Sequence, residues 1–441
     1  MSHDMIALVM FAGMMLMLVT GQRVFAAIGF VAALAGVLLW GTGGVTIPFS
    51  AAMKLMQWYP LLTLPMFIFM GYVLSESRIA DDLYRMFHVW MGPVRGGLAI
   101  GTIGLMVLIS AMNGLSVAGM AIGATIALPE LLRRGYDKIM VTGVIQAGSS
   151  LGILVPPSVV LVLYAMIARQ PVGQLWLAGA VPGLMMAGLF IVYIAIRCRI
   201  QSHLGPVLPE DEREKISLAE KIRLLGAGIL PLAIFAAMMV PFVNGWTSLV
   251  ESSAIGALTA FAAAVLKRRM TYQVFEDSVR KTLGISCMFM WIILAALAFG
   301  AIFDGLGAVN AIEGLFTEQL GLNPWMILIL MQLSFILMGT FLDDTAMLVI
   351  VAPLYVPLVD ALGFNLIWYG VLYTITTQIA YMTPPFGYNL FLMRAMAPPE
   401  IALADIYRSI IPFVLVMMVA LALIMVFPQI ALWLPGLVYG Y

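Results

Sequence analysis

Ser110-Ala111-Met112-Asn113-Gly114-Leu115-Ser116 interrupts, with small and polar residues, a run that is otherwise as apolar as a membrane span. At an offset of 228 residues this stretch falls on Met338 to Asp344, which overlaps a second interruption, Gly339-Thr340-Phe341-Leu342-Asp343-Asp344-Thr345, and the surrounding residues match at the same offset without a gap. Pro129 matches Pro357 in this way, and Pro156-Pro157 matches Pro384-Pro385. Two matched interruptions of hydrophobic segments indicate a transporter's binding site, because a bilayer tolerates non-helical backbone only against protein or a water-filled cavity.

The composition is that of a membrane protein with many helical spans. Of the 441 residues, 63% are hydrophobic and 10% are charged, and the mean hydropathy is +1.05. These values exclude a soluble globule. The net charge of zero gives no indication of a nucleic-acid partner, and the presence of only two cysteines argues against a disulfide framework or a metal cluster.

Apolar runs separated by Pro, Gly and charged residues predict an all-α polytopic membrane protein with two similar halves. Each half is expected to contain plain spans, an interfacial arm helix, a re-entrant helical hairpin and a discontinuous helix. The predicted arms are 76–94 and 304–321, the hairpins 96–134 and 326–362, and the discontinuous helices 138–168 and 366–396, broken at 156–157 and 383–385. The predicted plain spans are 5–20, 24–40, 60–74, 175–196, 224–243, 250–266, 283–303 and 410–434, with a glycine-rich connection at 40–60.

The first arm has the pattern of an amphipathic helix too charged to span a membrane. Its apolar residues form one stripe, and its charged residues face elsewhere. Such a helix is expected to lie in the membrane interface, the alternative being a helix in a soluble loop. The stripe consists of Ile79, Leu83, Met86 and Trp90, and the charged set of Asp81, Asp82, Arg85 and His88.

The distribution of basic residues predicts the orientation. Segments 197–223 and 267–281 carry six and five Lys or Arg residues, and two predicted spans separate them, so both are expected to face the cytoplasm. Between Lys281 and Arg394 there is no Lys or Arg, so the second arm and hairpin are expected to enter from the opposite face. The Arg-rich first arm and hairpin enter from the cytoplasm. The two halves are therefore predicted to be inverted repeats, with both chain termini in the periplasm.

If each hairpin tip contacts the break of its own half, the halves provide two cages of neutral oxygens for a cation. Sodium suits such cages, because carbonyl and hydroxyl oxygens satisfy a hard monovalent cation. The simpler alternative is that each interruption is a helix kink without a ligand. The first cage comprises Ser110, Asn113, Gly152, Val155 and Pro157, and the second comprises Gly339, Ala380, Thr383 and Phe386.

Asp343 and Asp344 are anomalous, since a carboxylate at the centre of a membrane helix costs roughly 2.5 to 3.5 kcal/mol on insertion scales. Either one of them assists cation binding or refolding of the tip, or one caps the returning half-helix and the other lies in water. Glu251, by contrast, is explained by a capping box with Ser248. The candidate substrate-binding residues are Ser116, Ser149, Ser150, Asp343, Asp344 and Thr377. Four more polar residues, Gln146, Thr374, Thr376 and Gln378, either line the same cavity or only bond neighbouring helices.

Nearly from end to end, the chain resembles the large membrane subunit of TRAP transporters, the DctM-like family. The motifs are Leu151-Gly152-Ile153-Leu154-Val155-Pro156-Pro157-Ser158, Pro129-Glu130 followed by Arg134-Gly135-Tyr136-Asp137, Arg95-Gly96-Gly97-Leu98, Gly339 to Asp343, and Thr383-Pro384-Pro385. The resemblance implies an ion-transporter-superfamily fold, sodium coupling, and a match between the two cages and the family's two sodium sites. The sequence departs from the family at Ala380, where Gly is frequent, at Gln22-Arg23, and at the additional acid Asp344.

The resemblance also implies a fixed scaffold, a moving elevator domain that carries both hairpins, and two partners. The partners are a small four-helix Q-type membrane subunit, expected as a separate chain, and a periplasmic substrate-binding protein. The scaffold would be residues 1–75 and 224–303, the arms 76–95 (cytoplasmic) and 304–321 (periplasmic), and the transport domain 96–173 and 322–402. The remaining segments are a span at 174–198, a cytoplasmic loop at 199–223 and a C-terminal helix at 403–441.

The predicted function is sodium-coupled import of an organic anion, a carboxylate, across the bacterial inner membrane, without enzymatic activity. A stand-alone sodium/divalent-anion symporter without partner subunits is the alternative. An intramembrane enzyme is suggested only by Asp343-Asp344, and the chain has no His-Glu-x-x-His motif. A channel is disfavoured, because the breaks make closed cages and not a ring.

Overall fold

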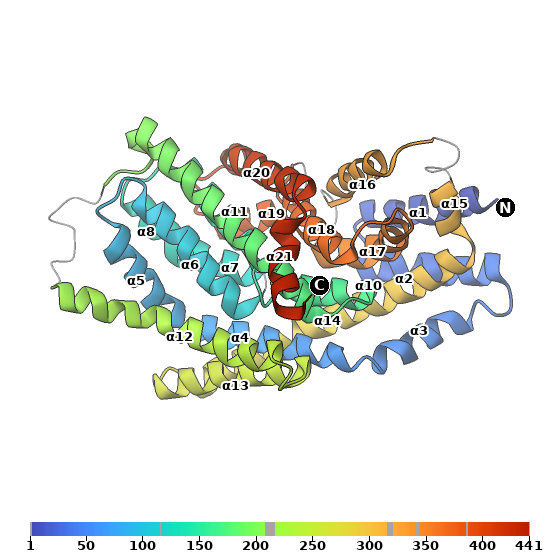
Figure 1. Ribbon diagram of the computed structural model, residues 1–441, viewed down its shortest axis with the longest axis horizontal. Helices are drawn as coiled ribbons and strands as arrows, with labels where there is room; N and C mark the ends of the chain where they lie inside the picture. Colours follow the sequence, from blue (N-terminus) through green and yellow to red (C-terminus); the bar gives the residue numbers. More distant parts are fainter. Residues whose placement is uncertain are drawn as a thin grey trace.

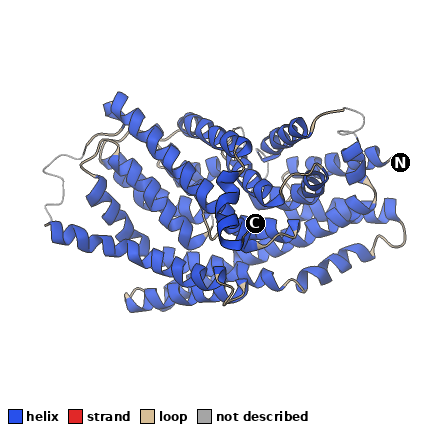
Figure 2. Ribbon diagram, viewed as in Figure 1, coloured by secondary structure: helices blue, strands red, loops and turns tan. Residues whose placement is uncertain are grey.

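The computed structural model describes residues 2–114, 116–207, 217–314, 321–339, 344–384 and 387–440. Within these residues all regular secondary structure is helical, as the sequence predicts (Figure 2). The helices share one connected core of apolar side chains, which includes residues of both halves. In Figure 1, α12 and α13 lie along the lower edge of the bundle and α16 at its upper edge, while α7, α10 and α18 lie towards the centre.

The first half contains eleven helices among the residues described. They are α1 (His3–Val19), α2 (Val24–Ala35), α3 (Thr46–Met56), α4 (Thr63–Glu76), α5 (Ile79–Met91), α6 (Gly97–Asn113), α7 (Ser116–Ile122), α8 (Leu128–Arg133), α9 (Lys138–Ser150), α10 (Val159–Ala168) and α11 (Val172–Ile200). A π-helical turn, Gly123–Ala127, joins α7 to α8. The predicted hairpin is thus α6 followed by α7 and α8, and the predicted discontinuous helix is α9 followed by α10.

The second half has ten helices in its described part. They are α12 (Leu218–Val243), α13 (Leu249–Leu266), α14 (Tyr272–Gly305), α15 (Ala308–Gly314), α16 (Pro324–Gly339), α17 (Asp344–Ala361), α18 (Leu366–Tyr381), α19 (Tyr388–Met396), α20 (Leu403–Val426) and α21 (Gln429–Tyr439). The hairpin is α16 with α17, and the discontinuous helix is α18 with α19. The capping box at the start of α13 is confirmed, because Ser248 and Glu251 exchange hydrogen bonds between side chain and backbone.

Helix boundaries in the two halves recur at the 228-residue spacing. α7 and α17 begin at Ser116 and Asp344, and α9 and α18 begin at Lys138 and Leu366. The residues before α9 and α18 are both N-caps whose side chains accept hydrogen bonds from backbone N–H groups in the first turn: Asp137 accepts from Met140, and Asn365 from Trp368. The helix ends recur as well, at Arg133 with Ala361 and at Ala168 with Met396.

Six segments of the described residues are long and apolar enough to cross a membrane, by length and composition. They are Tyr59–Glu76, which contains α4, and the helices α11, α12, α13, α14 and α20. Shorter apolar helices include α1, α6, α10, α16 and α21. The protein is therefore a polytopic helical membrane protein.

The structure differs from the sequence prediction at three helices. α3 lies within the predicted glycine-rich connection and packs Ala51 and Leu55 towards the core. α14 begins at Tyr272, eleven residues before the predicted span, because its charged first turns are helical too and carry pairs such as Glu276–Arg280 at 2.8 Å. The predicted C-terminal helix is two helices, α20 and α21, since Pro428 cannot continue α20.

The amphipathic pattern of the first arm is confirmed in α5 except at Trp90. Ile79, Leu83 and Met86 are buried, while Asp81 and Arg85 are exposed. Trp90, predicted as part of the apolar stripe, is exposed because its indole N–H donates to the Lys221 carbonyl at 3.1 Å. The location of α5 in the membrane interface stays a prediction. In the second arm the structure describes α15, whereas residues 315–320 lie outside the described residues.

Ion pairs fasten the first arm to the loop between α13 and α14 and to α14 itself. Lys267 Nζ donates to Asp82 Oδ2 at 2.5 Å, Arg269 donates to Asp82 Oδ1 at 2.8 Å, and Lys281 Nζ donates to Glu76 at 2.6 Å. Burial alone would raise the pKa of Asp82, but the hydrogen bonds from Lys267 and Arg269 lower it below its usual value. The first arm and the basic segment 267–281 therefore lie at the same end of the molecule.

Candidate functional site

The first hairpin tip lies directly on the first helix break. α6 ends at Asn113, and Gly114 follows in a left-handed conformation with φ 65° and donates its N–H to the Ser110 carbonyl at 3.1 Å. The Gly114 carbonyl accepts from Val159 N–H, the first residue of α10, at 3.3 Å. A Cβ on Gly114 would lie closer than 3.0 Å to the Pro157 carbonyl oxygen, so only glycine permits this approach.

Two prolines free backbone carbonyls at this break. Pro156 and Pro157 have no N–H, so neither can donate to the carbonyls four residues earlier, those of Gly152 and Ile153. The Ser158 hydroxyl donates to the Ile153 carbonyl at 2.5 Å and also caps α10, accepting from Leu161 N–H. The Gly152 carbonyl thereby remains without a helical donor, as a cation ligand requires.

The residues of the predicted first cage converge at this contact, as far as the structure describes them. Ser110 is buried, and its hydroxyl donates to the Met106 carbonyl at 2.6 Å, which leaves lone pairs of the oxygen to accept. Val155 is buried and packs against Gly183 of α11. Asn113 is the last residue of α6, and its side chain lies outside the described residues. The C-terminal end of α6, with its partial negative charge, adds to the preference for a cation.

The second hairpin meets the second break at Gly339 and Ala380. α16 ends at Gly339, where an added Cβ would overlap the Ala380 side chain of α18. Thr383 donates its hydroxyl to the Ile379 carbonyl at 2.6 Å, and its own carbonyl accepts from Gly387 N–H at 3.3 Å. The described members of the second predicted cage, Gly339, Ala380 and Thr383, are therefore neighbours. Phe386 lies outside the described residues, as do Asp343 and the side chain of Asp344, so their predicted roles are not addressed by the structure.

The two discontinuous helices contact each other at equivalent positions. Gln378 Nε2 donates to the Ser150 carbonyl at 2.7 Å across a sequence separation of 228. Asn389 Nδ2 of α19 donates to the Ser149 hydroxyl at 3.4 Å, and the hydroxyls of Tyr381 and Ser116 lie 3.5 Å apart. Three predicted substrate contacts, Ser116, Ser149 and Ser150, are thus brought together, whereas the Thr377 hydroxyl donates to the Tyr373 carbonyl of its own helix.

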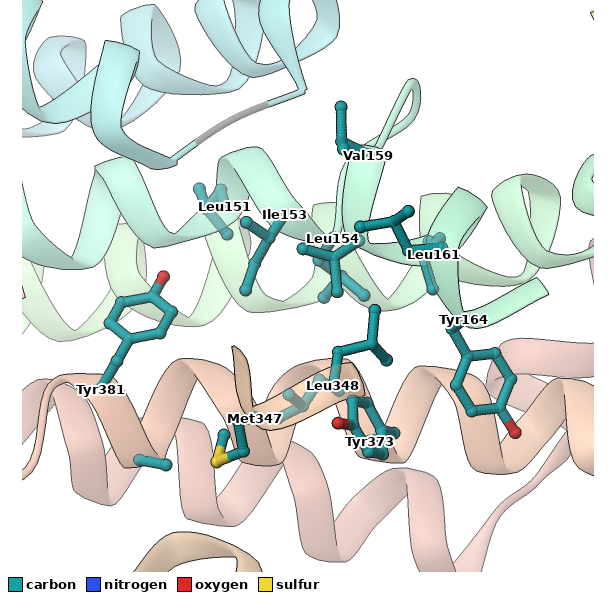
Figure 3. Close-up of a cluster of buried hydrophobic side chains, with 14 of the residues drawn as sticks. Leu151, Ile153, Leu154, Val159, Leu161, Tyr164, Met347, Leu348, Tyr373 and Tyr381 are labelled. Atoms are coloured by element: carbon teal, nitrogen blue, oxygen red, sulfur yellow. The ribbon is translucent and has the colours of Figure 1, made fainter. Parts of the chain in front are cut away.

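Apolar side chains surround this polar contact. In Figure 3, Leu151, Ile153 and Leu154 of the first break face Met347 and Leu348 of α17, and Tyr373 and Tyr381 extend from α18. The Tyr164 and Tyr373 rings, from opposite halves, lie 5.6 Å apart. All of these side chains are buried, so the polar groups between the halves lie in a low-dielectric environment where each unpaired atom is costly.

Three amides in this region have an unpaired buried oxygen. Gln146 Nε2 donates to the Thr142 carbonyl and to the Ser409 hydroxyl, both at 3.2 Å, so its amide orientation is fixed and Oε1 is left without a donor. Gln378 Oε1 and Asn389 Oδ1 are likewise buried and unpaired among the described residues. Sequence reasoning did not single out Asn389, and its only sequence signal is a polar residue in the apolar run just after the second break.

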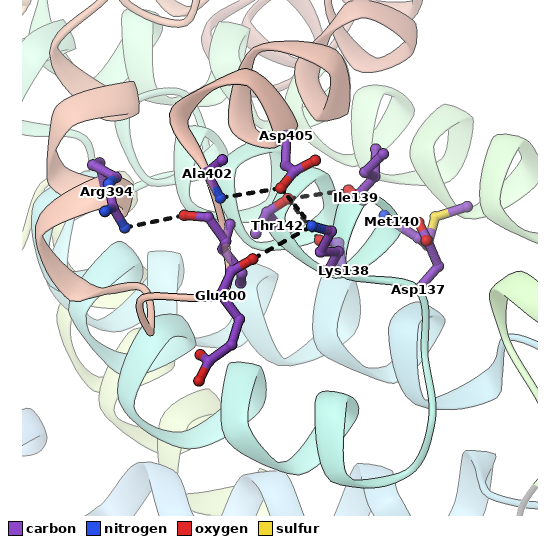
Figure 4. A network of polar contacts seen from close by, with 10 residues as sticks. Asp137, Lys138, Ile139, Met140, Thr142, Arg394, Glu400, Ala402 and Asp405 are labelled. Carbon is purple, nitrogen blue, oxygen red and sulfur yellow. Dashed lines mark hydrogen bonds and ion pairs between the residues drawn. The ribbon is translucent and has the colours of Figure 1, made fainter.

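An ion pair fixes the start of the first discontinuous helix to α20. Lys138 Nζ donates to Asp405 Oδ2 at 2.6 Å and to the Glu400 carbonyl at 3.4 Å (Figure 4). Asp405 also accepts from Ala402 N–H at 3.0 Å. Groups of His, Cys, Asp and Glu that could hold a transition metal are absent from the described residues.

Two hairpin tips seated on two helix breaks, inside a bundle of apolar helices, are the features of a secondary-transporter permease. The chain matches the family described as the tripartite ATP-independent periplasmic transporter, DctM component, over residues 9–430. It belongs to this family, and the resemblance noted in the sequence is confirmed.

Relatives of this chain align with nearly its whole length. The C4-dicarboxylate TRAP transporter large permease protein DctM of Pseudomonas aeruginosa is 29% identical over 88% of this chain and 89% of its own length. The sialic acid TRAP transporter large permease protein SiaM of Vibrio cholerae is 26% identical over 93% and 94%. The crystal structure of the Alcanivorax borkumensis YdaH transporter superposes with a TM-score of 0.66 over 96% of this chain and 98% of that one, at 15% identity, and thus shares the fold.

Proposed function

We propose that this TRAP large permease imports an organic anion across the bacterial inner membrane, driven by sodium, after a periplasmic binding protein delivers the substrate. A small Q-type membrane subunit, on a separate chain, completes the transporter. The permease has no enzymatic role in this scheme. The names of its relatives support a carboxylate substrate, since C4-dicarboxylates and sialic acid are both carboxylic acids.

The observation that carries the sodium proposal is the contact of each hairpin tip with the break of its own half. The first tip contacts its break where Gly114 meets Pro157, and the second where Gly339 meets Ala380. These contacts place helix ends beside backbone carbonyls and hydroxyls. Sodium is bound by such neutral oxygens, whereas a proton relay needs titratable side chains. The nine predicted cage residues remain our assignment for the two sodium sites.

Two observations support inverted repeats and an elevator mechanism. Helix boundaries recur at the 228-residue spacing, and Gln378 contacts Ser150, its equivalent at that spacing. Equivalent positions can touch only if they lie close to an axis that relates the two halves. In our proposal the hairpins and discontinuous helices around this axis move as a unit against a scaffold of α1 to α4 and α12 to α14, with both termini in the periplasm.

The unpaired oxygens of Gln146, Gln378 and Asn389 support a substrate cavity between the halves. Buried polar groups are nearly always paired, so a cluster of acceptors without donors is expected where a ligand or water binds. Ser116, Ser149 and Ser150 lie beside them, and the Ser149 and Ser150 hydroxyls, which donate to the Gln146 and Ala147 carbonyls of their own helix, would turn away from these carbonyls to donate to a carboxylate. Thr377, Asp343 and Asp344 complete the proposed contacts.

The direct test is uptake by proteoliposomes that contain the permease and the Q-type subunit, with radiolabelled succinate or N-acetylneuraminate and a candidate binding protein outside. We expect uptake to require an inward sodium gradient, the binding protein and both membrane subunits. Uptake driven by a pH gradient alone, with no response to sodium, would refute the coupling. Full uptake by the permease without either partner would instead support the alternative, a stand-alone symporter.

A further inference from the structure

A groove opens between α11 and α20, away from the hairpin tips. Its volume is about 440 Å³, and it is lined at one end by Asp137, Arg197 and Arg408 and further along by Tyr193, Ile411 and Leu415. α11 and α20 are both candidate membrane spans, and the two arginines lie near the last turns of α11 and the first turns of α20. The groove therefore begins at the level where these helices leave the membrane and extends into it.

The two arginines at the polar end are available for a ligand. Arg197 and Arg408 are exposed, and neither forms a hydrogen bond or an ion pair with any described residue. Basic residues close by are already engaged, since Lys138 pairs with Asp405 and Arg394 donates to the Ile401 carbonyl. Asp137, the acid of the groove, accepts from Met140 N–H as the N-cap of α9. The polar end thus carries two positive charges without a hydrogen-bonded partner, of which Arg408 also acts electrostatically on Asp405.

The rest of the groove has an apolar surface. The Tyr193 and Phe413 rings, which line it, meet edge to face at 5.1 Å, and the lining residues Ile411 and Leu415 are 56% and 57% exposed. From Arg408 to Leu415 the helix rises about 10 Å. A positive end followed by a 10 Å apolar surface that runs into the membrane matches the shape of a phospholipid.

We infer that this groove binds one anionic phospholipid, whose phosphate lies between Arg197 and Arg408 and whose acyl chain follows Ile411 and Leu415. A free anion would leave the apolar surface uncovered. A partner helix could cover the apolar surface, but it would need an acidic side chain of its own to meet the two arginines, whereas an anionic phospholipid supplies both the negative charge and the apolar chain. Because α20 also holds the start of α9 through Asp405, the lipid would support the position of the first discontinuous helix.

The test uses purified full-length permease reconstituted into vesicles of phosphatidylcholine, alone or with phosphatidylglycerol, then released in mild detergent for native mass spectrometry. We expect one phosphatidylglycerol to remain bound, and phosphatidylcholine not to replace it. The double variant Arg197→Gln/Arg408→Gln should retain at least about tenfold less, because each arginine near an anionic surface strengthens binding several-fold. The matched control, Arg199→Gln/Arg268→Gln, removes two exposed arginines outside the groove and should retain the lipid.

Two further measurements distinguish other occupants. Inorganic phosphate should not displace the lipid, and Leu415→Gln should weaken its retention, since the acyl chain contributes to binding. Both arginine variants should melt within a few degrees of wild type, because the replaced side chains are exposed. Equal retention by the two double variants would overturn the inference, as would equal retention of phosphatidylcholine, displacement by phosphate, or a crosslink from position 411 to the small membrane subunit.

Discussion

Replacing Gly114 with alanine tests whether the close approach of the hairpin tip to the break determines sodium affinity. The new Cβ would lie inside 3.0 Å of the Pro157 carbonyl oxygen, whereas ordinary contacts begin at 3.4 Å. To relieve this overlap the tip must move by on the order of 1 Å, because carbon and oxygen pack at about 3.5 Å or more. A binding constellation tolerates displacements of only about 0.5 Å. We therefore expect Gly114→Ala to raise the sodium concentration for half-maximal uptake at least tenfold, about 1.4 kcal/mol.

The matched control is Gly363→Ala. Gly363 also has a left-handed backbone, with φ 78°, but an added Cβ meets nothing within 4 Å there. Both variants carry the same backbone strain of roughly 1 to 2 kcal/mol for a residue other than glycine. Only Gly114→Ala carries the overlap with Pro157, so the difference between the two variants isolates the tip contact.

The assay is sodium-dependent uptake in proteoliposomes, together with melting temperatures of the purified variants. Both melting temperatures should fall, and that of Gly114→Ala should fall further because of the overlap. Gly363→Ala should keep the half-saturating sodium concentration within about twofold of wild type, since distant sites act independently. A folded Gly114→Ala protein with wild-type sodium dependence would refute the reasoning. It would leave the contact between Gly114 and Pro157 as a matter of packing alone.

Three other predictions follow from the same structure. Asn113→Ala and Thr383→Ala should each lower the apparent sodium affinity at least tenfold, about 1.4 kcal/mol, in uptake measured against sodium concentration. Both variants should still insert and purify. If these residues only shape a helix kink, the variants should instead give less folded protein with unchanged sodium dependence. In sealed cells, and in a background without the exposed Cys287, a membrane-impermeant thiol reagent should label Asp360→Cys and not Arg133→Cys, and equal labelling would exclude the inverted repeat. Asp82→Asn should lower the melting temperature at neutral pH, because ion pairs hold the folded pKa below the ordinary 3.8. The stability that these ion pairs contribute is present above the pKa of Asp82 in the unfolded chain and is lost as the pH falls through its pKa in the folded protein. The difference in melting temperature between Asp82→Asn and wild type should therefore close below about pH 4.

The sequence predicted those helix boundaries that depend on local chemistry. The break at Gly114, the break at Pro156-Pro157 and the capping box at Ser248 each follow from what glycine, proline or a capping side chain does to the backbone next to it. The length of α14 was not predicted, because the apolar run marks the span and not the charged helical turns before it. α3 was not predicted either, since the glycines before it resemble a loop and its helix depends on packing with α14.

The sequence predicted only part of the candidate site, because only some of its contacts have a signal in the local sequence or in the repeat. The sequence offset paired each hairpin tip with its break, and the described members, from Ser110 to Pro157 and from Gly339 to Thr383, do lie together. The bond between Asn389 and Ser149 joins segments 240 residues apart and has no local signature. The groove between α11 and α20 likewise arises only when Arg197 and Arg408 are brought to one place by the tertiary fold.

The hydrogen bond between Gln378 and Ser150 makes the two halves unequal where they meet. In a pair of identical halves each partner would donate to the other, but here the amide of Gln378 donates across the contact and the Ser150 hydroxyl turns back to the Ala147 carbonyl of its own helix. The bond therefore has one direction only. If the halves are inverted in the membrane, this direction gives the molecule an inherent polarity between its two faces. Swapping the residues at 150 and 378 would reverse the direction of this bond.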